Sequence, residues 1–264
     1  MKWIKALPNL MTLANVFLGM LAILFIVESS ERVEISNQLT QNFEITAKPS
    51  NFMYLGIAGY LILLAAVFDF LDGFVARLLK AQSELGAQLD SLADMVTFGV
   101  APAMIIYKLM ESALAIESNG FGASTVKLWP SLLIGVSACY RLAKFNIDTE
   151  QIAYFKGIPT PASAILIISL PFILISDTIG VANYLLNYNT LLIITLVISY
   201  LMISNIPMLA FKFKNFKIKD NISRYLVLAI GISSIVVFGY SGIPVAFLTY
   251  LIISLLSRKQ IIQS

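Results

Sequence analysis

The sequence predicts an all-α membrane protein, a polytopic bundle of about eight transmembrane helices. Hydrophobic residues occupy 58% of the 264 positions and charged residues only 12%, whereas about 25% of the residues of a soluble domain are charged. The apolar residues form long stretches over nearly the whole chain, as membrane-spanning helices require. Histidine is absent and cysteine occurs once, which excludes a histidine-containing triad, an HExxH zinc site and an internal disulfide.

Eight apolar stretches approach the length of about 20 residues that a helix needs to cross a bilayer. The first follows Lys2 and Lys5 without an A-x-A-like cleavage site, so we expect a retained helix. Residues 28–51 are polar and acidic, which predicts an aqueous loop, and "GYSGIP" predicts a turn between the last two helices. The eight stretches lie near residues 8–27, 53–76, 86–110, 129–146, 160–177, 186–210, 222–239 and 242–257.

The chain is expected to form one transmembrane domain over residues 1–264. Within it, residues 1–220 would make a six-helix catalytic core, and residues 221–264 would add a C-terminal helix pair. We expect no separate soluble domain, and nothing in the sequence indicates a nucleic-acid partner.

The distribution of positive charge predicts the orientation, because lysine and arginine concentrate in cytoplasmic segments. With the N-terminus inside, the opposite side holds only Arg32, Lys48, Lys108 and Lys127. Both termini and the connection at 77–85 would then be cytoplasmic, in a multi-pass protein of the cell (inner) membrane. The cytoplasmic segments would hold Lys2, Lys5, Arg77, Lys80, Arg141, Lys144, Lys156, Lys212, Lys214, Lys217, Lys219, Arg224, Arg258 and Lys259.

Four aspartates flank the 77–85 connection, namely Asp69, Asp72, Asp90 and Asp94. Spacings of three and four put each pair on one face of its helix, and a short connection should bring the two faces together. Four carboxylates in a low-dielectric setting repel one another and need compensating charge. Oxygen ligands without histidine or cysteine favour Mg²⁺, Mn²⁺ or Ca²⁺. Two such ions about 3.5–4 Å apart would make a two-metal phosphoryl-transfer site.

The residues between the aspartates suit a bulky ligand. Gly73, Ala76 and Gly86 are small, so a ligand or another helix can approach the backbone closely. Arg77 follows within about two helical turns of Asp69. Its guanidinium could meet a phosphate oxygen or pair with a carboxylate.

The whole stretch reads D-x-x-D-G-x-x-A-R, eight residues, then G-x-x-x-D-x-x-x-D. It resembles the signature of the CDP-alcohol phosphatidyltransferase family at every signature position. The resemblance implies that family's membrane fold, two divalent cations (Mg²⁺ or Mn²⁺, with Ca²⁺ as a further occupant) and a general base, Asp94. The implied metal ligands are Asp69, Asp72, Asp90 and Asp94. The implied CDP pocket contains Gly73, Ala76, Arg77 and Gly86.

Other segments point to the acceptor alcohol. "LPNLMTLANVFLGMLAI", "DSLADMVTFGVAPA", "RLAKFN" and "FKGIPTPASA" look like the membrane-embedded phosphatidylserine synthases of bacteria and archaea. The resemblance implies CDP-diacylglycerol and L-serine as substrates, membrane lipid as the surroundings, and a homodimer as an assembly that the family often forms. It also brings Asn9 and Thr12 near the nucleotide or metal region, although Asn9 would equally suit a helix N-cap.

The carboxylate of serine would need a cation near Asp94. Arg141 and Lys144 lie three apart at a predicted cytoplasmic helix end, so they share a face, and Lys156 follows in the same connection. We take Arg141 and Lys144 as serine-binding candidates. The alternative is that these cations only set topology, with their stems along the lipid.

Two other functions stay open at this point. A sister enzyme would use the same CDP-lipid with glycerol phosphate or inositol phosphate. An ion or proton transporter would use intramembrane carboxylates as a relay. A relay needs carboxylates along the whole pathway, and outside the cluster the predicted spans contain only Asp177.

Overall fold

The computed structural model describes residues 2–29, 49–117, 124–147, 155–209, 218 and 221–257. Most of the loop predicted at 28–51 and the basic residues 212–219 and 258–259 lie outside this part. The predicted helical fold is confirmed, with helices at all eight expected segments. The α-helices are α1 (Lys2–Glu28), α2 (Pro49–Leu78), α3 (Glu84–Asp94), α4 (Ala101–Glu117), α5 (Leu132–Ile147), α6 (Thr160–Ser176), α7 (Ala182–Leu185), α8 (Tyr188–Ile203), α9 (Ile222–Phe238) and α10 (Gly242–Leu256).

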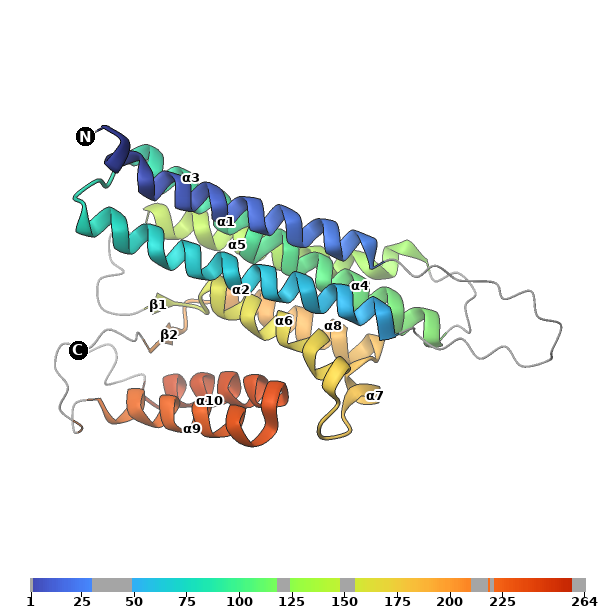
Figure 1. Cartoon of the computed structure of the whole chain (residues 1–264). Coiled ribbons are helices and arrows are strands. Elements are labelled where there is room, and N and C mark those ends of the chain that lie inside the picture. The colour runs from blue at the N-terminus through green and yellow to red at the C-terminus, as the bar shows by residue number, and fades with distance from the viewer. Residues whose placement is uncertain are drawn as a thin grey trace.

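Several helical stretches are long and apolar enough to cross a membrane. Four of them are Ala6–Glu28, Phe52–Leu78, Glu84–Glu117 and Ile222–Leu256, and the shorter apolar helices α6 and α8 accompany them. The last stretch folds back at the 3₁₀ turn η3 (Gly239–Ser241), so that α9 and α10 lie side by side along the bundle (Figure 1). Helices suit this setting because they satisfy their own backbone hydrogen bonds without water.

The centre of the bundle is built around α4, whose Ile105, Ile106 and Leu109 are fully buried. They belong to one apolar cluster with residues of α1, α2, α6 and α8. The outer faces are also apolar, as at Phe17 of α1, which is 65% exposed. In a membrane protein this second apolar surface faces lipid, so burial alone does not separate core from exterior here.

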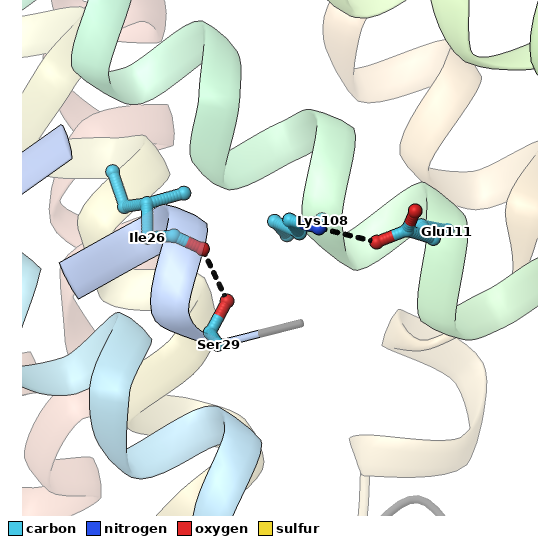
Figure 2. Close-up of polar contacts among 4 residues, drawn as sticks. All are labelled: Ile26, Ser29, Lys108 and Glu111. Atoms are coloured by element: carbon cyan, nitrogen blue, oxygen red, sulfur yellow. Dashed lines mark hydrogen bonds and ion pairs between the residues drawn. The ribbon is translucent and has the colours of Figure 1, made fainter. Parts of the chain in front are cut away.

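Local contacts in α1 and α4 show how polar groups are satisfied away from the aspartates. Ser29 Oγ donates to the carbonyl of Ile26 at 2.6 Å, and Lys108 Nζ pairs with Glu111 Oε2 at 2.7 Å (Figure 2). Both contacts are local to one helical turn. The first lies at the end of α1 and the second in the middle of α4, and neither forms a site between helices.

Three features were not predicted. A π-helical turn, η1 (Met95–Val100), joins α3 to α4, and a 3₁₀ turn, η2 (Thr125–Ser131), precedes α5. The strands β1 (Phe155–Lys156) and β2 (Pro207–Met208) also pair antiparallel. The predicted span 186–210 was therefore wrong about its end, because α8 stops at Ile203 and the chain turns into β2.

The segment around β1 is clamped against the end of α8. Gly157 N donates to Ile206 O at 2.8 Å, and Ile158 N donates to Leu201 O at 3.1 Å. Gly157 has a φ of +74°, and a Cβ there would lie 2.7–2.9 Å from three carbonyl oxygens of residues 201–204. Only glycine fits this crossing. The clamp fixes the start of α6, including Thr160, beside α5.

Candidate active site

The turn between α2 and α3 orients the two pairs of aspartates. Asp69 and Asp72 lie on the last turns of α2, and Ser83 caps α3 by accepting a hydrogen bond from Gly86 N at 3.0 Å. The chain then runs back so that Asp90 and Asp94 lie on α3. Helix α1 packs along both α2 and α3 (Figure 1). Helix α1 therefore holds α2 and α3 so that their aspartate-bearing faces lie close together.

Three of the aspartates converge. One carboxylate oxygen each from Asp69, Asp72 and Asp90 lies within 4.8 Å of the others. Asp90 Oδ1 is buried and has no hydrogen-bond partner among the described residues. A buried carboxylate oxygen without a hydrogen-bond partner is costly in a group of carboxylates unless a cation compensates the charge. The group could therefore hold a metal ion, and its all-oxygen ligand set suits a hard divalent cation.

Asp94 lies beside this group, at the end of α3. Its carboxylate is close enough to those of Asp69 and Asp90 for their charges to repel. Asn15 Nδ2 of α1 donates to Asp94 Oδ1 at 3.4 Å. Asp94 is also the last residue of α3, immediately before the π-helical turn. Such turns often occur at functional sites, because they re-aim the adjoining side chains.

The predicted polar residues of α1 reach the site. Thr12 Oγ1 lies 2.6 Å from Asp72 Oδ2 and donates to it, and both side chains are buried. Asn9 Oδ1 lies over Gly86, where an added Cβ would approach it to 3.1 Å. The N-cap reading of Asn9 is wrong, since α1 begins at Lys2 and Asn9 is inside the helix.

A cavity of about 370 Å³ opens beside the carboxylates. Every residue predicted for CDP-lipid binding lines it, together with Asp72 and Asp90. At Gly73 the nearest atom to an added Cβ is Arg77 Nη2 at 4.0 Å, so the backbone is open to the cavity. The lining consists of Pro8, Asn9, Thr12, Asp72, Gly73, Ala76, Arg77, Ala81, Gln82, Ser83, Gly86, Ala87 and Asp90.

Arg141 lies on the Asp94 side of the site. It is 9% exposed, and it is near enough to Asp94 for their charges to attract. Its Nη1 donates to Thr160 Oγ1 at 3.1 Å, while its Nε is buried without a hydrogen-bond partner among the described residues. A buried guanidinium that keeps an unused donor is suited to an anionic ligand.

Lys144 has a different environment. Its Nζ donates to Asn205 Oδ1 at 2.7 Å, which links α5 to the segment after α8. With Arg141 and Lys156 it lines a pocket of only about 10 Å³, room for one water molecule. This pocket is too small to hold an amino acid.

Some site residues were not predicted from the sequence. Gln82 and Ser83 line the cavity from the α2–α3 turn, and Asn15 contacts Asp94. Asn15 carried a usable signal, because Asn9, Thr12 and Asn15 recur at helical spacing on α1. Gln82 belongs to no run of polar residues at helical spacing, so the sequence did not point to it.

The same region matches known proteins. The profile of the CDP-alcohol phosphatidyltransferase family matches residues 5–202. Three similar proteins are each named CDP-diacylglycerol–serine O-phosphatidyltransferase. The one from Helicobacter pylori is 30% identical over 251 residues, covering 93% of this chain and 87% of that protein. The one from Methanocaldococcus jannaschii is 33% identical over 187 residues, covering 71% and 76%.

The third relative, from Mycobacterium leprae, is 35% identical over 174 residues. The match covers 63% of this chain but only 47% of that longer protein. The profile match extends over the carboxylate cluster, the cavity and Arg141. The chain therefore belongs to the CDP-alcohol phosphatidyltransferase family of membrane transferases.

Proposed function

We propose that this protein is a CDP-diacylglycerol–serine O-phosphatidyltransferase. It would transfer the phosphatidyl group of CDP-diacylglycerol to the hydroxyl of L-serine, giving phosphatidylserine and CMP. The observation that carries the proposal is the convergence of Asp69, Asp72 and Asp90 beside a cavity lined by small residues and Arg77. The names of the three relatives, each a serine O-phosphatidyltransferase, support serine as the acceptor.

Asp69, Asp72, Asp90 and Asp94 are the proposed ligands of two divalent cations, Mg²⁺ or Mn²⁺, with Ca²⁺ as a further occupant. Bound there, the cations would neutralise the diphosphate and the negative charge that develops during transfer. Thr12 would hold Asp72 in its orientation through the 2.6 Å hydrogen bond. Such fixed ligands favour catalysis because they need no reorganisation during the reaction.

The cavity would receive the CDP part of the lipid. The open backbone at Gly73 and the small side chain of Ala76 allow a nucleotide to approach α2 closely. Arg77 offers a planar guanidinium to a phosphate oxygen, and Asn9 lies over Gly86 on the opposite wall. These contacts would position the diphosphate at the carboxylates.

Asp94 is the proposed general base. It would accept the proton of the serine hydroxyl, and the oxygen would attack the phosphorus that bears diacylglycerol. A new oxygen–phosphorus bond forms as the bond from that phosphorus to the oxygen of CMP breaks. Arg141 would bind the serine carboxylate, since it is buried near Asp94 with an unused donor. Lys144 is a second candidate for that contact.

The orientation, domain organisation and assembly of the protein are also proposed. The active site would face the cytoplasm of a cell (inner) membrane, with residues 1–220 as the catalytic core and residues 221–264 as an added helix pair. A homodimer is compatible with this arrangement. A transporter would need Asp177 as a further carboxylate of its relay. Asp177 Oδ1 instead accepts a hydrogen bond from Ala182 N at 3.0 Å, at the start of α7, which disfavours that alternative.

A panel of acceptor alcohols tests the function. Purified protein in detergent is given labelled CDP-diacylglycerol and Mn²⁺ or Mg²⁺ with L-serine, glycerol 3-phosphate or inositol phosphate. We expect CMP release with L-serine and a lipid product that carries serine. CMP release only with one of the other two alcohols would instead identify a sister enzyme.

A further inference from the structure

Asn15 is the buried polar residue of α1 that the mechanism above leaves unused. Its side chain is fully buried, and its Nδ2 donates to Asp94 Oδ1 at 3.4 Å. Its Oδ1 is buried as well and has no hydrogen-bond partner among the described residues. A buried amide oxygen without a donor costs free energy, so its presence in a site calls for an explanation.

The orientation of this amide follows from its neighbour. A carboxylate can only accept hydrogen bonds, so the side of Asn15 that faces Asp94 must be the NH₂ group. The Oδ1 atom then necessarily points elsewhere. Backbone packing holds the residue in place, because Thr97 Oγ1 donates to Asn15 O at 3.4 Å. The amide oxygen is thus a fixed acceptor next to the proposed base.

The close approach of α1 to the π-helical turn keeps the amide fixed. At Gly19, one helical turn after Asn15, an added Cβ would lie 2.5 Å from Thr97 Oγ1. The two segments therefore touch at a position that admits no side chain. A polar group held this rigidly is preorganised for a ligand, which reduces the entropy lost on binding.

Serine has one group that the proposed mechanism does not bind. Its hydroxyl goes to Asp94 and its carboxylate to Arg141, which leaves the α-ammonium with three donors and no acceptor. The three groups of serine lie within a few bonds of one another, so their partners must converge. Asp94 is the shared neighbour of Asn15 and Arg141.

Resting on the proposed function, we infer that Asn15 Oδ1 accepts a hydrogen bond from the α-ammonium of the acceptor and so selects an amino alcohol. The amide has two tasks at once. Its NH₂ group holds Asp94, and its oxygen meets the positive end of the substrate. Glycerol phosphate and inositol phosphate carry no ammonium, so they could offer this oxygen only a neutral hydroxyl donor and would lose the charge-assisted hydrogen bond.

The test removes the ammonium from the substrate and the amide from the protein. The metal-loaded enzyme is assayed with L-serine and with 3-hydroxypropanoate, which is serine without its α-amino group. For the parent and for Asn15→Leu, the Michaelis constant of serine is compared with the inhibition constant of 3-hydroxypropanoate against serine. Both constants are independent of the fraction of protein that folds correctly.

We expect Asn15→Leu to raise the Michaelis constant of serine about ten- to a hundredfold, as loss of a charge-assisted hydrogen bond does. The inhibition constant of 3-hydroxypropanoate should change less than about threefold, because it has no ammonium to lose. Equal weakening of both acceptors would overturn the inference and reduce Asn15 to a positioning residue for Asp94. An altered Mn²⁺ requirement with unchanged acceptor selectivity would overturn it in favour of a metal ligand.

Two controls separate this inference from the proposed function. Ser169→Ala removes another fully buried polar group, a hydroxyl that donates to Leu166 O of its own helix, and should leave both constants unchanged. A parent enzyme without serine-dependent CMP release would overturn the proposed function and this inference together. A serine-dependent parent whose selectivity survives Asn15→Leu would overturn the role of Asn15 alone.

Discussion

Asp94 differs from the other three aspartates in its contacts. Asp69, Asp72 and Asp90 present oxygens to one another, whereas Asp94 is held by an amide from α1. We predict that Asp94→Asn lowers turnover about 10²–10⁴-fold, because an amide cannot take the serine proton. Binding of CDP-diacylglycerol should be largely spared, as measured by its Michaelis constant. Turnover within a few-fold of the parent would remove Asp94 from the role of base.

A second prediction for a single residue concerns Arg141. Arg141→Ala should raise the Michaelis constant of serine at least about tenfold, with little change for CDP-diacylglycerol, and Arg141→Lys should recover part of the loss. A guanidinium grips a carboxylate with two parallel hydrogen bonds, whereas an ammonium acts as a point charge. Steady-state kinetics with each substrate varied in turn measures both constants.

Lys144→Ala is the matched comparison, because Lys144 is one turn further along α5 and is engaged by Asn205. It should have a smaller effect on serine than Arg141→Ala. If Arg141→Ala instead weakens CDP-diacylglycerol and spares serine, Arg141 is a phosphate contact.

At the scale of elements, the packing of α1 against the π-helical turn decides the geometry around Asp94. Gly19→Ala should destabilise the protein by about 1–3 kcal/mol through overpacking against Thr97, and should lower activity by shifting Asn15. Thermal unfolding in detergent measures the first effect and CMP release the second.

Gly135→Ala on α5 is the control for that prediction. Gly135 is also buried in a helix, but its added Cβ would meet nothing closer than 3.9 Å. Alanine there should be neutral or slightly stabilising, since it is the better helix former. Equal unfolding temperatures for Gly19→Ala and Gly135→Ala would contradict the tight α1 contact.

The sequence predicted those parts of the site that follow from helical periodicity. Asp69, Asp72, Asp90 and Asp94 could be paired because spacings of three and four define a helix face. Gly157 and the β1–β2 ladder could not be predicted, since they depend on a crossing between segments about 50 residues apart. The contact of Asn15 with Asp94 likewise required the relative rotation of α1 and α3, which local spacing does not specify.

For the whole molecule, the predicted orientation puts the α2–α3 turn in the cytoplasm and the turn after α6 outside. The end of α6 lies by the start of α2, where Ile175 approaches Gly56, and so away from Lys80. In a Cys139→Ala background, Lys80→Cys should react with a membrane-impermeant maleimide only in inverted vesicles. Thr178→Cys should react in intact cells. The reverse labelling would contradict the charge-based topology.

We propose that the carboxylate cluster supports transfer only with divalent cations bound, and removal of those ions tests this. Purified protein is incubated with labelled CDP-diacylglycerol and L-serine before and after chelation of divalent ions, and CMP and lipid products are quantified. We predict CMP and phosphatidylserine in equal amounts, no turnover after chelation, and recovery when Mg²⁺ or Mn²⁺ is restored, because Asp69, Asp72 and Asp90 converge and need compensating positive charge. Undiminished transfer to serine after thorough chelation would contradict it.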